Sequence, residues 1–78
     1  MKSLDKLVTG EKGVIIQFEI ANLPLKLIEM GCLPGNEVEL LYLAPFNDPL
    51  YFKVDGTHIA IRKDLACQIF IDSIKEYD

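Results

Sequence analysis

Residues 50–61, LYFKVDGTHIAI, carry the clearest structural signal in this sequence of 78 residues. Leu50, Phe52 and Val54 alternate with Tyr51 and Lys53, and this alternation predicts a strand with one face toward the core. The pair Asp55-Gly56 follows at once. A two-residue type I′ turn favours such a pair because both of its positions need positive φ. Residues 50–54 and 57–61 are therefore predicted to form a β-hairpin.

Two more strands are predicted upstream of this hairpin and one downstream. In residues 14–20 every even position is apolar, so the inner face is expected to be Val14, Ile16, Phe18 and Ile20. For the strand after residue 36, the expected inner set is Val38, Leu40, Tyr42 and Ala44. Residues 68–72, QIFID, read as the last strand.

A short helix is predicted between the first two strands, in residues 22–31. Asn22 is a plausible N-cap, Pro24 suits the first turn, and Gly31 suits the left-handed position that ends a helix. One apolar stripe should lie against the sheet: Leu23, Leu27 and Met30. The next four residues, LPGN, have Pro34 and Gly35 at the two centre positions of a type II turn.

These elements predict a mostly β fold in a single domain covering residues 1–78. Five short strands with tight turns and one inserted helix favour a small, partly open barrel that curls to protect its edges. Leu41 and Leu43 make the second face of their strand apolar too. The predicted helix is expected to cover that face, while a partner surface and self-association are the alternatives.

Composition argues against several kinds of partner. The net charge of −4 disfavours nucleic acid and anionic membranes, because both attract clusters of Lys and Arg. No apolar run is long enough to cross a bilayer, and residues 1–5, MKSLD, lack the apolar centre of a signal peptide. A cytosolic protein without direct membrane insertion is expected. Its two cysteines should then be free thiols, with Cys67 in the core and Cys32 partly exposed.

We find no pattern of residues that predicts catalysis or a bound metal. No two of His58, Cys32 and Cys67 stand at the short spacing typical of zinc or iron sites. Asp48 and Asp55 are conceivable acids or bases, but both lie beside turn residues, where short carboxylates usually bond their own backbone. We therefore predict no enzyme activity, no cofactor and no metal site.

Several ordered segments resemble the FeoA family of ferrous iron transport proteins. They are LIEMGCLPG at residues 27–35, APFNDPL at 44–50 and IAIRK at 59–63, preceded by LDKL at 4–7 and GEKG at 10–13. Two positions differ from the family's pattern. Lys26 stands where the family often has Arg, and Asn47 stands where it often has Gly, although Asn can adopt the same left-handed conformation.

The resemblance implies an SH3-like barrel that acts as an accessory protein of ferrous iron uptake. Its partner would be a membrane permease for ferrous iron that carries its own cytosolic GTPase domain. The leading hypothesis is an adaptor that contacts this cytosolic part through an apolar region around the helix and the turn: Leu27, Met30, Gly31, Leu33 and Pro34. The alternative is a metal-sensing module that binds Fe(II) weakly through carboxylates and His58.

Overall fold

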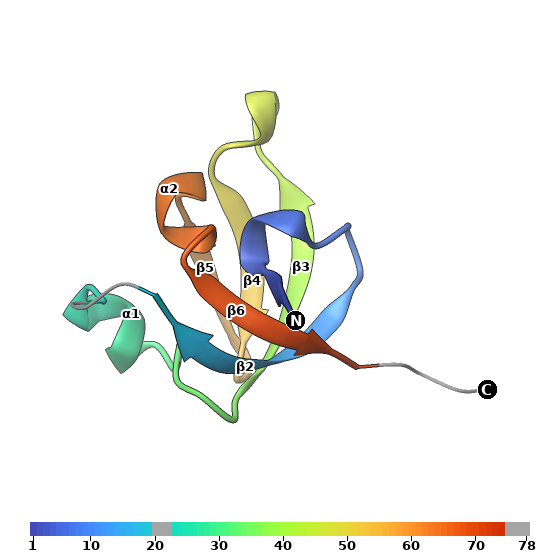
Figure 1. Cartoon of the computed structure of the whole chain (residues 1–78). Helices are drawn as coiled ribbons and strands as arrows, with labels where there is room; N and C mark the ends of the chain where they lie inside the picture. The colour runs from blue at the N-terminus through green and yellow to red at the C-terminus, as the bar shows by residue number, and fades with distance from the viewer. Residues whose placement is uncertain (20–22, 75–78) are drawn as a thin grey trace.

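The protein is described by a computed structural model that covers residues 1–19 and 23–74 (Figure 1). Its elements are β1 (Lys2–Ser3), the 3-10 helix η1 (Leu4–Lys6), β2 (Lys12–Phe18), α1 (Leu25–Glu29), β3 (Glu37–Leu43), the 3-10 segment η2 (Pro45–Asn47), β4 (Leu50–Val54), β5 (Thr57–Ile61), α2 (Lys63–Ala66) and β6 (Ile69–Ser73). The strands form one antiparallel sheet in the order β1-β6-β2-β3-β4-β5.

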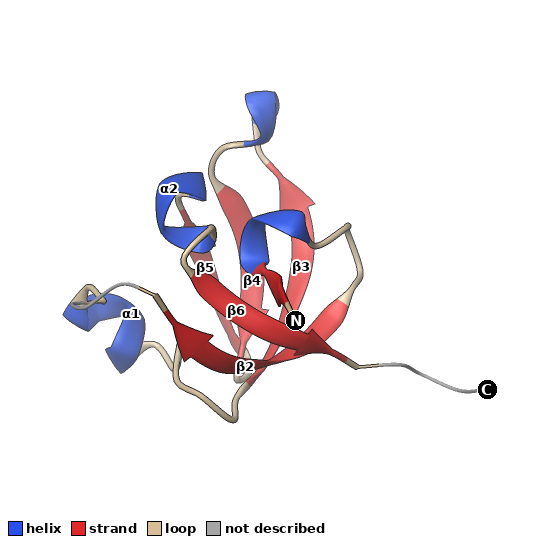
Figure 2. Cartoon of the chain, viewed as in Figure 1, coloured by secondary structure: helices blue, strands red, loops and turns tan. Residues whose placement is uncertain are grey.

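This sheet curls on itself, and the short helical segments sit at its margins (Figure 2). The inside is filled by one apolar cluster, whose largest fully buried side chains include Phe52, Leu4, Ile15, Leu40 and Ile71. The prediction of a mostly β, partly open barrel is confirmed. Its sheet contains one strand more than the expected five, because the two residues of β1 pair with β6.

The β4–β5 hairpin has the predicted form. Leu50, Phe52 and Val54 are buried, and Val54 pairs with Thr57 across the turn. Asp55 and Gly56 both have positive φ, at 48° and 81°, as a type I′ turn requires.

The helix and the turn that follows it are also confirmed. Leu27 is buried on the core side of α1, with Leu23 and Met30 packed partly against the same cluster. Gly31 has φ 102° and ends the helical turn. Pro24 occupies the N-cap position, and the proposed cap Asn22 lies outside the described residues.

The inner face predicted for the first strand is partly wrong, because β2 contains a bulge. Ile15 pairs with Ile71 and Gln17 pairs with Phe70, so Ile16 is an extra residue on this strand. Before the bulge the odd residue Ile15 is fully buried, whereas Val14 and Ile16 are half-buried. After it Phe18 packs against the core as predicted. Ile20 lies outside the described residues.

A second bulge corrects the prediction for β3. Leu40 pairs with Phe52, but Tyr42 pairs with Tyr51, so Leu41 is the extra residue. Val38 and Leu40 are fully buried as expected, whereas Tyr42 is 54% exposed. A single inserted residue reverses the side that each following side chain faces, because side chains alternate along a strand. Ala44, the last member of the predicted inner set, is half-buried.

The predicted burial of the two cysteines is wrong: Cys67 was expected in the core and Cys32 was expected to be partly exposed, but the structure shows the reverse. Cys32 is fully buried, and Cys67 is exposed at the C-terminal end of α2, where its thiol lies 3.2 Å from the carbonyl oxygen of Asp64. Both are free thiols. The backbone N–H of Cys32 donates to the Leu27 carbonyl at 2.9 Å, so the chain turns inward after α1 and carries this side chain into the core. Burial raises the pKa of the Cys32 thiol to about 11.

Gly13 lies where β2 and β6 are in close contact. A Cβ added at this position would meet the side chain of Ile71 and would lie 2.9 Å from the backbone oxygen of Asp72. Both atoms belong to β6, which pairs directly with β2. The absence of a side chain at Gly13 therefore allows these two strands to approach.

We predict that Gly13→Ala lowers the free energy of unfolding by about 1–3 kcal/mol, since β6 must move to make room for the methyl group. Urea denaturation measures this loss. Val8→Ala is the control, because Val8 is 68% exposed in the loop before β2 and its truncation should change the free energy of unfolding by less than about 0.5 kcal/mol. A Gly13→Ala protein as stable as the wild type would contradict the packing described here.

The cysteines provide a matched pair of substitutions. Cys32→Ser should cost about 1–3 kcal/mol, because a hydroxyl group replaces a thiol in an apolar core. Cys67→Ser should change the free energy of unfolding by less than about 0.5 kcal/mol, because its side chain is exposed. In native protein an alkylating reagent should label Cys67 and spare Cys32. Equal labelling of the two thiols would show that Cys32 is not buried in solution.

Candidate functional site

The predicted partner site lies where α1 leads into the type II turn, and its residues divide between core and surface. Leu27 is only 7% exposed and belongs to the core. Met30 and Gly31 are half-buried, whereas Leu33 is 42% exposed and Pro34 is also exposed. Sequence reasoning missed Leu25, which is 67% exposed on the same helix. We call the accessible set Leu25, Met30, Leu33 and Pro34 the helix–turn surface.

Backbone hydrogen bonds hold this surface against the barrel. The N–H of Gly35 donates to the carbonyl of Ile15 at 2.7 Å, which ties the turn to β2. Within the turn, the N–H of Asn36 donates to the carbonyl of Leu33 at 3.1 Å. The side-chain amide of Asn36 donates to the carbonyl of Gly31 at 2.7 Å and so joins the turn to the end of α1. A surface ordered in advance loses little conformational freedom when a partner binds.

A second set of exposed apolar side chains lies at the tip of the barrel, at the end of β3 and in the loop that follows it. Phe46 is 99% exposed and has φ 65°, a conformation that side chains larger than Gly rarely adopt. Tyr42 and Leu43 are exposed close by in the sequence, and the Tyr42 ring stacks on Tyr51 with centroids 4.5 Å apart. We call Tyr42, Leu43 and Phe46 the tip surface.

The loop that carries Phe46 is fixed at both ends. The N–H of Ala44 donates to the carbonyl of Pro49 at 3.1 Å, and the N–H of Asn47 donates to the carbonyl of Ala44 at 2.8 Å. Asp48 was expected to bond its own backbone, but it bonds another part of the chain instead. Its Oδ1 accepts the N–H of Lys63 at 2.9 Å. This contact joins the loop to the start of α2.

The expected cover for Leu41 and Leu43 is not provided by the helix. Figure 1 shows α1 beside the far end of β2, on the other side of the molecule from the tip where β3 ends. Because of the bulge at Leu41, Leu43 pairs with the buried Leu50, and Tyr42 with Tyr51. The apolar outer face at this end of β3 therefore comes from the tyrosine pair.

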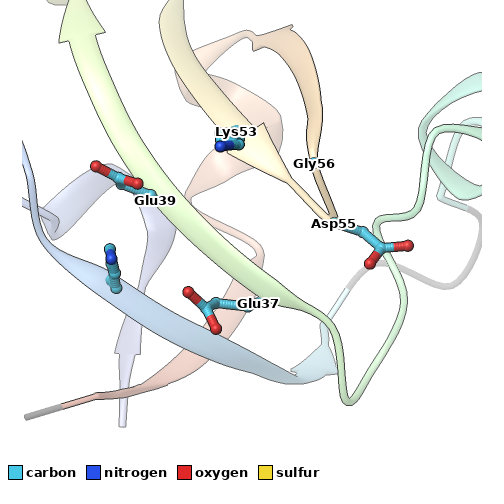
Figure 3. A pocket seen from close by; sticks show the side chains of 6 residues that line it. Glu37, Glu39, Lys53, Asp55 and Gly56 are labelled. Atoms are coloured by element: carbon cyan, nitrogen blue, oxygen red, sulfur yellow. The ribbon is translucent and has the colours of Figure 1, made fainter.

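A shallow cavity of about 350 Å³ lies on the outer face of the sheet (Figure 3). Its lining is Lys12, Glu37, Glu39, Lys53, Asp55 and Gly56. Lys12 pairs with Glu39, and Glu39 pairs with Lys53, so opposite charges stand side by side across three strands. In Figure 3 the side chain of Asp55 points away from Glu37 and Glu39. Cross-strand charge pairs of this kind stabilise a sheet. The lining residues include no apolar or aromatic side chain, whereas small-molecule sites are lined mainly by such side chains.

The carboxylate of Glu11 has a structural role. Glu11 Oε2 lies 2.7 Å from Lys2 Nζ and accepts the Ser73 hydroxyl at 2.9 Å, and Oε1 accepts the N–H of Val8 at 3.1 Å. The hydrogen bond from Lys2 is the main reason that the pKa of Glu11 is lowered. Glu11 thus joins the N-terminus, the turn before β2 and the end of β6.

The residues proposed for weak metal binding are spread over the surface. His58 is exposed on β5, where its neighbour across the hairpin is Lys53. Across residues 1–19 and 23–74, no three side chains of His, Cys, Asp or Glu are grouped so that they could hold a metal ion. None of the helices in these ranges is long and apolar enough to cross a membrane.

Comparison with known proteins places the chain in a family. A sequence model of the FeoA domain matches residues 2–73. A fusion protein of Porphyromonas gingivalis, Fe(2+) transport protein A joined to the Fe(2+) transporter FeoB, is 29% identical over 72 residues. This match covers 91% of the chain and 8% of the fusion protein.

Two solved structures show the same architecture. Iron(II) transport protein A of Clostridium thermocellum superposes with a TM-score of 0.84 and 34% identity, over 92% of this chain and 45% of that one. The zinc complex of Stenotrophomonas maltophilia FeoA, described as a prokaryotic SH3 domain protein, superposes with a TM-score of 0.73 and 27% identity. This match covers 92% of this chain and 91% of that one. The chain spans less than half the length of the fusion protein and of the C. thermocellum protein.

The match to the family over residues 2–73, together with the curled antiparallel sheet and its inserted helix, shows that this chain belongs to the FeoA family, which is associated with ferrous iron transport, and has an SH3-like fold.

Proposed function

We propose that this protein is a non-enzymatic accessory protein of ferrous iron uptake, which binds the cytosolic GTPase part of a ferrous iron permease and modulates it. The main support is the P. gingivalis relative, in which a related segment is fused to the transporter FeoB. Two domains joined in one chain stay at high effective concentration, so a fusion favours modules that act on each other. The partner would place this protein in the cytoplasm.

The chemistry of the surface favours binding over catalysis. The exposed features are rigid apolar groups on tight turns and a charged sheet face whose Lys and Glu side chains pair across strands. Rigid apolar side chains that protrude from a protein surface are typical anchors of protein–protein interfaces. Of the groups that could take part in chemistry, Glu11 is engaged by Lys2 and Cys32 is buried, while the exposed His58 and Cys67 lie on different elements, β5 and the end of α2.

The helix–turn surface is our candidate for the contact with the permease. Leu33 and Pro34 protrude from a turn that is bonded to β2, and Leu25 extends the apolar area along α1. Leu27, named in the sequence-based hypothesis, supports this surface from below as part of the core. A partner would therefore bury Leu25, Leu33 and Pro34, while Leu27 keeps the helix in place.

The test is a titration of isotope-labelled protein with the isolated GTPase domain of a ferrous iron permease, followed by NMR with and without nucleotide. We expect chemical-shift changes confined to the helix–turn surface. Leu33→Asp should weaken binding at least about tenfold, because a carboxylate would be desolvated at the centre of an apolar contact. Val8→Asp is the matched control: Val8 is 68% exposed, and the substitution adds the same charge.

Two further arms separate the alternatives. If Phe46→Asp abolishes binding while Leu33→Asp has no effect, the tip surface is the contact and the helix–turn surface is not. Anaerobic Fe(II) alone should leave the spectrum unchanged. Shifts centred on His58 or the aspartates without any partner would instead support the metal-sensing function.

A further inference from the structure

Strand β5, Thr57–Ile61, is an unusually open edge of the sheet. It lies at one end of the strand order, opposite β1, which is only two residues long. Exposed edges are normally blunted by charged residues, proline, a bulge or short length. The sequence THIAI contains no Lys, Arg, Asp, Glu or Pro, and all five residues pair with β4 without a register shift.

The hairpin geometry shows which backbone groups of β5 are free. In a two-residue hairpin the residues that flank the turn, Val54 and Thr57, exchange both backbone hydrogen bonds. Bonded and non-bonded pairs then alternate, so the N–H and C=O groups of His58 and Ala60 point away from β4. Within residues 1–19 and 23–74 no backbone hydrogen bond from outside the hairpin reaches these two residues, and both are exposed.

We propose that β5 pairs with β5 of a second copy of this chain in an antiparallel arrangement, so that two barrels form a symmetric dimer through one continuous sheet. One register pairs all five residues. It places Ile59 opposite Ile59 on the two-fold axis and His58 opposite Ala60 of the second copy. In this register the outward-pointing groups of His58 and Ala60 form four hydrogen bonds between the copies.

The side chains are compatible with this register. Ile59 and Ile61 point into the core of their own barrel and stay there. On the outer face, the imidazole of His58 would lie next to Ala60 of the second copy, whose methyl group leaves room for the ring. Tyr51 of β4 pairs with Ala60 of β5 and is half-buried, so its ring would lie beside the contact between His58 and Ala60.

Charge favours the antiparallel direction. Arg62 follows β5 and is still extended, with φ −66° and ψ 147°, so the register continues to it. It would face the Asp55-Gly56 turn of the second copy, and the same contact recurs at the other end by symmetry. Arg62 and Asp55 are both exposed in the single chain. A parallel pairing would instead bring each charge beside its own equivalent.

Sedimentation velocity over a wide range of protein concentration tests this proposal. We expect the wild-type protein to shift from monomer to dimer as the concentration rises. Ala60→Pro removes an outward-pointing N–H that β4 does not use, and by symmetry two of the four bonds are lost. Dimerisation should weaken about 10- to 100-fold. Ala60→Ser keeps the N–H and should still dimerise.

A second variant guards against misfolding of the proline protein. Arg62→Glu lies outside the hairpin ladder and should also weaken the dimer, because it would face Asp55 of the second copy. An isotope-filtered NMR sample of labelled and unlabelled copies should show a contact between the Hα protons of Ile59 in the two chains. The proposal is overturned if the wild type stays monomeric at every concentration, or if Ala60→Pro and Arg62→Glu dimerise as the wild type does. It does not depend on the proposed permease partner.

Discussion

The constraint on which this structure depends is that one sheet must enclose most of the core, while single side chains of the short helical segments, Leu4, Leu27 and Ala66, complete it at the margins. Over residues 1–19 and 23–74 no helical layer covers a face of the sheet, so its strands have to curl until their inner side chains meet (Figure 2). The two bulges, at Ile16 in β2 and Leu41 in β3, each add one residue to one strand of a pair. Such insertions bend a strand and increase its local twist, which is what a small barrel needs.

The same bulges decide which side chains reach the surface. Beyond Leu41 the alternation is reversed, and Tyr42 is carried outside to stack on Tyr51. Beyond Ile16 it is reversed again in β2, and Phe18 is carried inward. The deformation that closes the barrel therefore also supplies part of the exposed apolar area at its tip. Curvature and surface chemistry are coupled here through one geometric feature.

A rigid barrel of this size suits a protein that acts by contact. Its loops are short and bonded to neighbouring strands, as in the bonds from Gly35 to Ile15 and from Lys63 to Asp48. The helix–turn surface, the tip surface and the β5 edge belong to different elements.

The sequence by itself determined the features that depend on near neighbours. The Asp55-Gly56 hairpin, the turn at Pro34-Gly35 and the end of α1 at Gly31 each require backbone conformations that few residues adopt, so a few letters identify them. The ordered segments that resemble FeoA proteins were enough to identify the family. The resemblance also led to a predicted partner contact at the turn that carries Leu33 and Pro34, and both of these side chains are exposed.

Only the tertiary structure decided the features that depend on pairing between distant strands. Bulges arise from how β2 fits β6 and how β3 fits β4, and in both strands apolar residues on two faces concealed the change of side. Cys32 is buried because the chain turns inward after α1. The exposure of Phe46 follows from a loop closed by contacts to Pro49 and Lys63, and such contacts between segments have no local sequence signature.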